Sequence, residues 1–344
     1  MPGMSPNNLK PERQYLEVLR KHPGQVFMAA ENAPVEGFGY FASVEYADKY
    51  PMDTNNPLKS KLMAMPKANR PRMLRLMLTK MLPMMIGIGR GFKDVAKDVK
   101  QLETTGKLGY QSEQRMANAP NIKLWEELKG YAWARWKVVL GFTELPLDFI
   151  FCDKAVLFKY VLVAIQEMDK EKINTAPDLD AGEEVLSVYS SLGIAVNDIA
   201  RWLRKQGVRS QANHPLGGLV STVPLAGKAG MGWMGQNGLL ITPQYGQRQR
   251  IAPIFVEAPI FAFTDSDEHR WIEEYCKKCM RCYKNCPTGA IYEEKQVRVE
   301  EITGFGPAKT CIDREKCFPY FNETLGCSIC VKVCPFSRAD GVYE

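Results

Sequence analysis

Residues 276–291 read CKKCMRCYKNCPTGAI, so that four cysteines follow the spacing C-x2-C-x2-C-x3-C and Pro287 stands after the last one. This spacing is typical of thiolates that hold a cubane iron–sulfur cluster. Pro287 turns Cys286 away from the first three thiols, and in two-cluster proteins the fourth thiolate of such a run binds the other cluster. The stretch therefore predicts an electron-transfer module that depends on a second set of cysteines.

That second set lies in residues 317–336, CFPYFNETLGCSICVKVCPF, which also end in a Cys-Pro pair followed by Phe. The same exchange of the last thiolate predicts two [4Fe-4S] clusters. The first cluster is assigned Cys276, Cys279, Cys282 and Cys334, and the second is assigned Cys286, Cys317, Cys327 and Cys330. Zinc favours two separate C-x2-C pairs and disulfides suit exported chains, so both alternatives fit less well. We expect Cys311 to be a free thiol and Cys152 to be a buried apolar residue.

The composition suits a globular protein in a reducing compartment. The 344 residues are 45% apolar, which is ordinary for soluble domains. The first residues, MPGMSPNNLKPERQ, contain no apolar stretch like that of a signal peptide, and no Arg-Arg export signal is present. Oxygen-sensitive clusters and ten cysteines fit the cytoplasm, so we expect a cytoplasmic protein that is also able to lie peripherally at a membrane.

The membrane expectation comes from residues 59–100, which hold eleven Lys or Arg against two Asp. Read as a helix, this segment places on one face Met73, Leu74, Met77, Leu78, Met81 and Leu82. A core helix with basic side chains reaching to solvent fits the pattern, and so does a segment that contacts a membrane surface or a lipophilic partner. The longest uncharged apolar run, residues 81–88, is far below the ~20 residues that span a bilayer. No nucleic-acid motif accompanies the basic charge, so nucleic acid is not an expected partner.

Three regions follow from the pattern along the chain. Residues 1–150 are expected to be mostly helical. Residues 151–268 contain a buried strand (KAVLFKYVLVAIQEM), an amphipathic helix that ends near Gly207, and two more candidate strands (GLLITPQYG and RIAPIFVEAPIFAF). This order predicts an α/β (α+β) core, and residues 269–344 form the cluster module.

A glycine-rich stretch, PLAGKAGMGWMGQNGLLITPQYG at residues 224–246, contains the pattern GxGxxG. A nicotinamide site needs this pattern to open a helix, whereas the residues that follow it here read as a strand. Nicotinamide binding is therefore disfavoured. The glycines would still allow the backbone to approach a flat or anionic ligand closely.

The stretches AGMGWMGQNGLLITPQYG and IQEMDKEKINTAP, together with the two-cluster tail, resemble the cobalamin-dependent reductive dehalogenases. The AGMGW-G-N piece and the tail also resemble epoxyqueuosine reductase. The resemblance covers about residues 155–338 and implies a nitroreductase-like cobalamin-binding core with a C-terminal ferredoxin-like module of two [4Fe-4S] clusters. It implies a base-off corrinoid, and the DxHxxG motif that supplies a His to cobalt is absent. Electrons would pass singly through the clusters to cobalt, which would reductively cleave a substrate bond.

The resemblance also suggests site residues. The residues assigned to the corrinoid are Gly230, Gly232, Gly235, Asn237 and Gly238. Val208 stands where the dehalogenases carry a Tyr proton donor, and NHPLGGLVS lacks the Asp of the epoxyqueuosine reductases. His214 and Tyr245 are the candidate replacement acids, and Arg250, or else Arg248, is the candidate basic partner. An ordinary loop His, a buried Tyr and a solvated strand-end Arg are the alternatives.

Three functions compete. The first is a cobalamin-dependent iron–sulfur reductase that takes a small, lipophilic substrate and receives electrons from a low-potential donor such as a ferredoxin or flavodoxin. The second is an electron-transfer protein without corrinoid. The third is a tRNA-modifying enzyme like epoxyqueuosine reductase, which the missing Asp disfavours.

Overall fold

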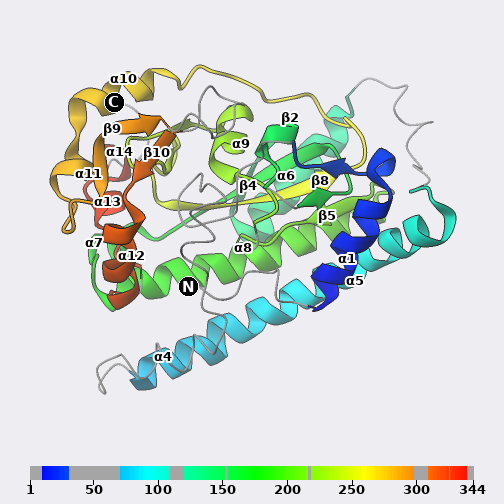
Figure 1. The fold of residues 1–344 in the computed structure, drawn as a ribbon, viewed down its shortest axis with the longest axis horizontal. Helices are drawn as coiled ribbons and strands as arrows, with labels where there is room; N and C mark the ends of the chain where they lie inside the picture. Colours follow the sequence, from blue (N-terminus) through cyan, green and yellow to red (C-terminus); the bar gives the residue numbers. More distant parts are fainter. Residues whose placement is uncertain are drawn as a thin grey trace.

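The computed structural model describes residues 10–30, 70–108, 120–151, 154–215, 218–297, 309–324 and 326–338 (Figure 1). Its centre is an antiparallel sheet with the strand order β2-β4-β8-β5. These strands are β2 (Val138–Glu144), β4 (Tyr160–Glu167), β5 (Ser210–Ala212) and β8 (Gln249–Val256). The shorter strands are β1 (Phe27–Met28), β3 (Ala155–Val156), β6 (Trp233–Met234) and β7 (Leu240–Ile241).

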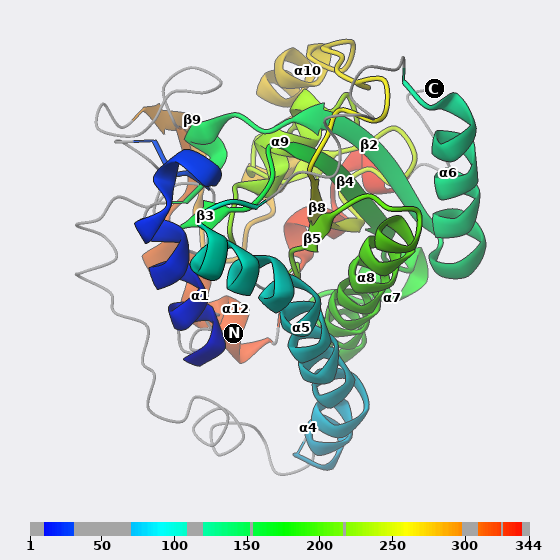
Figure 2. The same cartoon turned by 90° about the vertical axis from the view of Figure 1, so that its right-hand side faces the viewer.

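Helices pack against this sheet and give a mixed α+β architecture, as the sequence predicts. The helices before the C-terminal part are α1 (Lys10–Lys21), α4 (Arg70–Leu76), α5 (Leu82–Thr105), α6 (Ile122–Trp136), α7 (Lys170–Asn174), α8 (Leu179–Lys205) and α9 (Thr222–Lys228). Two short 3-10 turns lie at Pro23–Gln25 and Leu147–Phe149. Figure 2 shows α5 running alongside α8, and α5 also contacts the edge strand β5.

Both faces of the sheet are covered, which explains why β4 reads as a nearly continuous apolar run. Val161 and Val163 point towards a core cluster that includes residues of α1, α5 and α9. Leu162 and Ala164 point the other way, towards α6 and α8. The two sets alternate because successive side chains of a strand point to opposite faces.

Two of the expected strands are shorter than predicted, and several strands were not predicted. The helix with apolar residues at 3.6-residue spacing is confirmed as α8, and Gly207 follows it with a left-handed φ of 77°. The strand expected in GLLITPQYG is limited to Leu240–Ile241, and β8 ends at Val256. In the central sheet these are β5 and β2, and β2 lies before residue 150 and pairs along its whole length with β4.

The basic, Met-rich segment forms a long helical rod of α4, a π-helical turn at Met77–Met81 and α5; residues 59–69 lie outside the described part. The predicted single apolar face is divided: Met81 is buried, whereas Leu74, Leu78 and Leu82 are 53%, 59% and 54% exposed. Leu74, Leu78, Leu82 and Ile86 are spaced four residues apart. In an α-helix of 3.6 residues per turn, residues at this spacing rotate gradually around the helix axis. The π turn has more residues per turn and reduces this rotation, so the four side chains lie on the same exposed side. Among the described helices, none has the length and apolar character needed to cross a membrane.

The C-terminal part is built from short helices around a two-stranded sheet (Figure 1). Its elements are α10 (Trp271–Cys279), α11 (Arg281–Lys284), β9 (Ile291–Val297), β10 (Lys309–Ile312), α12 (Arg314–Glu323), α13 (Ile329–Lys332) and α14 (Pro335–Arg338). β9 and β10 pair antiparallel. This part, called the cluster module below, packs on the β6–β7 hairpin and on α7.

Candidate functional site

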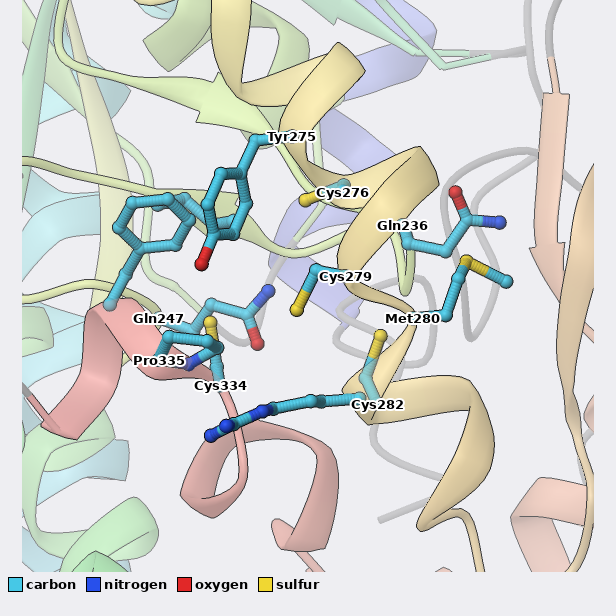
Figure 3. Close-up of a pocket in the computed structure, with 12 residues that line it drawn as sticks. Gln236, Gln247, Tyr275, Cys276, Cys279, Met280, Cys282, Cys334 and Pro335 are labelled. Atoms are coloured by element: carbon cyan, nitrogen blue, oxygen red, sulfur yellow. The ribbon is translucent and has the colours of Figure 1, made fainter.

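One set of thiols surrounds a pocket at the junction of the cluster module and the core (Figure 3). The cysteines that line it are Cys276, Cys279, Cys282 and Cys334. The first two lie on α10, Cys282 lies on α11, and Cys334 lies between α13 and α14. Figure 3 shows their sulfurs turned towards a common space. The structure thus brings Cys334 to the three thiols that precede it by about fifty residues in the chain.

The other four thiols form a second group, in which Cys286 is separated from its sequence neighbours. Burial is the main cause that raises the pKa of the Cys317 thiol to about 12. The charges of Cys330, Cys286 and Cys327 raise this pKa further. The position of Cys334 beside the first three thiols agrees with the exchange of the last thiolate, and the assignment of ligands to the two clusters stays a prediction. The described cysteines form no disulfides with one another, and Cys152 lies outside the described residues.

Burial makes most of these thiols reluctant to ionise without a metal. It raises the pKa of Cys282 and of Cys334 to about 12, and that of Cys330 to about 11. Cys286 differs: burial raises its pKa, but hydrogen bonds from Thr288 and from the backbone, including the Ala290 N–H at 3.3 Å, lower it further than burial raises it. Because metal ligation requires thiolates, binding of iron must release protons here.

The cluster module is fixed to the core through the turn before β8. Arg248 is buried and donates from Nε to the Ser337 carbonyl at 2.8 Å, and from Nη1 to the Met168 carbonyl at 3.1 Å and the Glu167 carboxylate at 2.6 Å. The Gln247 N–H donates to Ser337 Oγ at 3.1 Å. Arg248, which the sequence offered as a basic partner for substrate, is therefore committed to holding the module.

The glycines of the GxGxxG pattern serve the β6–β7 hairpin. A Cβ at Gly230 would lie 2.3 Å from the Thr264 carbonyl oxygen, and one at Gly232 would lie 2.1 Å from the Ile241 carbonyl oxygen. Both glycines have positive φ, 68° and 156°. The close approach that they allow is to the protein's own backbone. Gly238, with φ 78°, forms the hairpin turn.

The polar residues of the hairpin turn are held by side-chain amides. Asn237 and Gln247 exchange hydrogen bonds of 3.0 and 2.8 Å, and both are buried. Gly235 leaves room for them, since a Cβ there would lie 2.9 Å from Gln247 Nε2. Gln236 donates to the carbonyls of Tyr292 and Glu293 at 2.9 Å each. The hairpin is therefore joined to β8 and to β9.

Of the candidate catalytic residues, His214 and Arg250 contact the same side of α8. His214 is 8% exposed and packs so closely on Gly193 that a Cβ there would lie 1.7 Å from Nε2. Burial lowers the pKa of His214 from 6.5 to about 3, so the ring is neutral at physiological pH. The Arg250 guanidinium lies 4.6 Å from the ring centre of Tyr189, one helical turn before Gly193.

Tyr245 does not join these two residues. It is buried in the core cluster on the opposite face of the sheet. Burial raises its pKa, and the Glu167 carboxylate raises it further, so its phenol is neutral at physiological pH. The structure therefore gives no single acid–base centre made of His214, Tyr245 and Arg250.

Several residues that shape this region were not singled out by the sequence, namely Tyr189, Gln247 and Ser337. Tyr189 has one signal, because it lies in the apolar repeat of α8 and yet carries a hydroxyl. Gln247 and Ser337 have no signal of their own, because their roles depend on contacts between segments far apart in the chain.

Comparison with known proteins places both parts of the molecule. Residues 275–337 match a family model described as a 4Fe-4S double cluster binding domain. The tetrachloroethene reductive dehalogenase of Desulfitobacterium hafniense is 33% identical over 191 residues, which are 53% of this chain and 34% of the relative. The epoxyqueuosine reductase of Listeria monocytogenes is 31% identical over 122 residues, which are 35% of this chain and 31% of the relative.

A solved catabolic reductive dehalogenase is similar in fold, with a TM-score of 0.56 at 18% identity over 69% of this chain and 34% of that chain. The chain thus spans about a third of the length of these relatives. The predicted fold, a mixed helix–sheet core with a C-terminal double-cluster domain, is confirmed. Over part of its length the chain is thus similar in sequence to reductive dehalogenases and epoxyqueuosine reductases, and its residues 275–337 match a 4Fe-4S double-cluster domain.

Proposed function

We propose that this chain is a reductase in which two [4Fe-4S] clusters pass electrons singly to a base-off cobalamin that reductively cleaves a bond of a small substrate. One observation carries the proposal. The pocket of the first thiol set is lined jointly by the cluster module and by Gln236, Ile241 and Gln247 of the core. A cluster held there would touch the core directly, as electron delivery to a site in the core requires. Similarity to named reductases supports the same conclusion.

The second thiol set borders the side of α8 that faces Arg250 of β8. Cys330 packs in one apolar cluster with Val331 and Tyr189, and the ring of Tyr189 lies against the Arg250 guanidinium. Arg250 thus lies against a residue of the same apolar cluster as Cys330. We assign it the role of a basic partner for an electron-rich part of the substrate.

The corrinoid assignment has a structural limit. Gly230 and Gly232 do not fit close contact with a corrin ring, because the carbonyls of Thr264 and Ile241 occupy the space beside them. We therefore assign no corrinoid contact to these two glycines and derive no step from them. When bound, the corrinoid would supply the low-potential cobalt chemistry. His214 lies packed against α8 and His269 lies beside Glu268, an arrangement that supports a base-off form.

The proton that completes such a cleavage is proposed to come from water. Neutral His214 cannot deliver an imidazolium proton, and Tyr245 lies across the sheet from Arg250. A substrate with a good leaving group needs no stronger acid. In this proposal the substrate is small and lipophilic, and nucleic acid is not a partner.

The proposed electron donor is a low-potential ferredoxin or flavodoxin. Next to the first pocket, Trp271 and Tyr275 are 43% and 41% exposed, and the ring centre of Tyr275 lies 5.0 Å from that of Phe336, with the rings tilted by 59°. Arg281 lines the same pocket and is exposed. An aromatic surface with a basic rim next to a cluster suits an acidic redox protein.

Anaerobic electron delivery tests the proposal. The full chain with reduced clusters is mixed with cob(II)alamin, and the absorption of the clusters and of cobalt is followed. We expect the clusters to be oxidised as cobalt is reduced, and the Cys334→Ser variant to be slower. Clusters that are reoxidised by a ferredoxin but never by cobalamin would favour the electron-transfer alternative.

A further inference from the structure

The chain makes a tight turn directly after Cys286, in the sequence Cys-Pro-Thr-Gly. The Gly289 N–H donates to the Cys286 carbonyl at 3.1 Å, which closes the turn. Pro287 stands at the second position, where its fixed φ suits a turn of this kind, and Gly289 has a left-handed φ of 60°. The local sequence therefore fixes the third position of the turn, which is occupied by Thr288.

This turn brings two hydrogen-bond donors to the Cys286 sulfur. Thr288 Oγ1 lies 3.6 Å from Sγ, which is within hydrogen-bonding range for the large sulfur atom, and the Ala290 N–H donates to Sγ at 3.3 Å. A thiolate that binds iron carries no proton, so in the protein with its clusters the Thr288 hydroxyl can only donate. Ala290 is fully buried, and Thr288 and Cys286 are half-buried, which limits competition from water.

A second turn of the same kind follows Cys334, but its third residue differs. The Ser337 N–H donates to the Cys334 carbonyl at 3.0 Å, so Phe336 occupies the position that Thr288 has in the first turn. The ring centre of Phe336 lies 5.0 Å from that of Tyr275, and its side chain has no hydroxyl to offer a sulfur. A hydroxyl at the third position thus belongs to only one of these two turns.

We propose that Thr288, acting through Cys286, raises the reduction potential of the cluster that Cys286 binds, which is the second cluster in the predicted assignment. Reduction adds one electron to the cluster, and a hydrogen bond donated to a ligand sulfur stabilises the added negative charge. The bond therefore favours the reduced state. The inference rests on the double-cluster domain of residues 275–337 and does not require the corrinoid. With the hydroxyl in place, an electron that enters the module resides on this cluster for a larger share of the time.

An EPR-monitored redox titration of the anaerobic full chain tests the proposal. Thr288→Val keeps the shape of the side chain and replaces the hydroxyl by a methyl group. We expect one cluster signal to shift to a lower potential by about 60 mV, which is a tenfold change in the equilibrium constant of a one-electron step. The other signal should stay at its wild-type potential, with about eight irons retained. Thr288→Ser keeps the hydroxyl and should keep both wild-type potentials.

The matched control is Thr324→Val, the same substitution beside another cysteine of the second set. Thr324 Oγ1 donates to the Tyr320 carbonyl at 2.8 Å and accepts from the Cys327 N–H at 3.0 Å, so these bonds join the hydroxyl to backbone and not to a sulfur. We expect Thr324→Val to lower stability and to leave both potentials unchanged.

Four results would overturn the proposal. Two of them concern the potentials of the Thr288 variants: Thr288→Val leaves both at wild type, or Thr288→Ser shifts one as far as Thr288→Val does. The third is an equal shift of the same signal in Thr324→Val, because the effect would then come from a general disturbance of the module. The fourth is loss of a cluster in Thr288→Val, because the hydroxyl would then hold the cluster in place instead of tuning it.

Discussion

Gly246 brings its backbone against the carbonyl of Phe336, and a Cβ at residue 246 would lie 2.3 Å from that oxygen. Gly246 also has a left-handed φ of 58°. The contact joins the turn before β8 to the start of α14, close in sequence to Cys334. Close packing of backbone on backbone thus determines where the cluster module lies on the core.

This contact predicts that Gly246→Ala lowers the stability of the protein much more than an alanine substitution at another glycine with a similar left-handed φ. Gly289 is the matched control, since its φ is 60° and nothing lies within 4 Å of its Cβ position. We expect Gly289→Ala to cost about 1 kcal/mol for the left-handed backbone alone. Gly246→Ala should cost about 1–3 kcal/mol more, because the module must shift. The urea midpoint at which the cluster absorption is lost measures both, and equal midpoints would contradict the docking role.

In the predicted assignment each thiol set takes cysteines from both sequence motifs, and this predicts the iron content of double variants. Cys334→Ser combined with Cys276→Ser removes two ligands of the same set and should leave one cluster, about four irons. Cys334→Ser combined with Cys327→Ser removes one ligand from each set and should damage both clusters, although these two cysteines are closer in sequence. Iron analysis of the anaerobic proteins distinguishes the pairs. The reverse pattern would mean that each cluster takes its ligands from one sequence motif.

The buried His214 predicts a specific dependence of stability on pH. Its pKa is lowered by burial from 6.5 to about 3, so below pH 6.5 the unfolded chain binds a proton that the folded chain does not. The stabilisation is complete above pH 6.5 and is lost as the pH falls. Between pH 7.5 and 5.5 the loss is about 1.4 kcal/mol.

Urea unfolding of the wild type and of His214→Gln at these two pH values measures this loss. The wild type should lose about 1.4 kcal/mol more than the variant on acidification. Turnover of His214→Gln should follow the same pH profile as that of the wild type, since a neutral ring delivers no imidazolium proton. A rate that falls near pH 6.5 in the wild type alone would show that His214 is a working acid.

The exposed side of the α4–α5 rod predicts contact with an anionic membrane surface. Leu74, Leu78, Leu82 and Ile86 are 48–59% exposed, and the segment from residue 70 to residue 93 has six basic and no acidic residues. Apolar burial combined with attraction to anionic lipid is the basis of interfacial helix binding. We expect the full chain to sediment with vesicles of phosphatidylserine and phosphatidylcholine, and less so at high salt.

The double change Leu78→Ser and Leu82→Ser should weaken this binding at least about tenfold, because each leucine contributes roughly 1.5 kcal/mol or more when buried. Leu147→Ser is the control, since Leu147 is 42% exposed but lies outside the rod. If the rod variant binds vesicles as well as the control does, another surface is responsible. If the wild type binds an acidic redox protein and no vesicles, the rod serves a protein partner instead.

The parts of this molecule that sequence reasoning predicted depend on local patterns. The cysteine spacing and the 3.6-residue apolar period of α8 can each be recognised within a short stretch of sequence. The strand β2 was missed because α6 ends without a glycine: Lys137 itself takes the left-handed conformation, with φ 54°. No residue that usually ends a helix stands between α6 and β2. The sequence therefore does not show that the aromatic helix ends and a strand begins.

The candidate site was harder to predict because its residues meet only in the folded chain. A glycine that approaches a ligand and one that approaches a backbone carbonyl have the same sequence requirement, the absence of a Cβ. Gly232 was therefore assigned to the corrinoid, although the structure places it against Ile241. The burial of His214 depends in the same way on Gly193, twenty-one residues earlier in the chain.

The central claim is that two [4Fe-4S] clusters and a corrinoid work in one chain. Iron and cobalt analysis of the full chain, purified anaerobically, incubated with cobalamin and then desalted, tests it most directly. We expect about eight irons and about one cobalt per chain. About eight irons without cobalt would contradict the reductase and leave an electron-transfer protein, and zinc or about four irons would contradict the two clusters themselves.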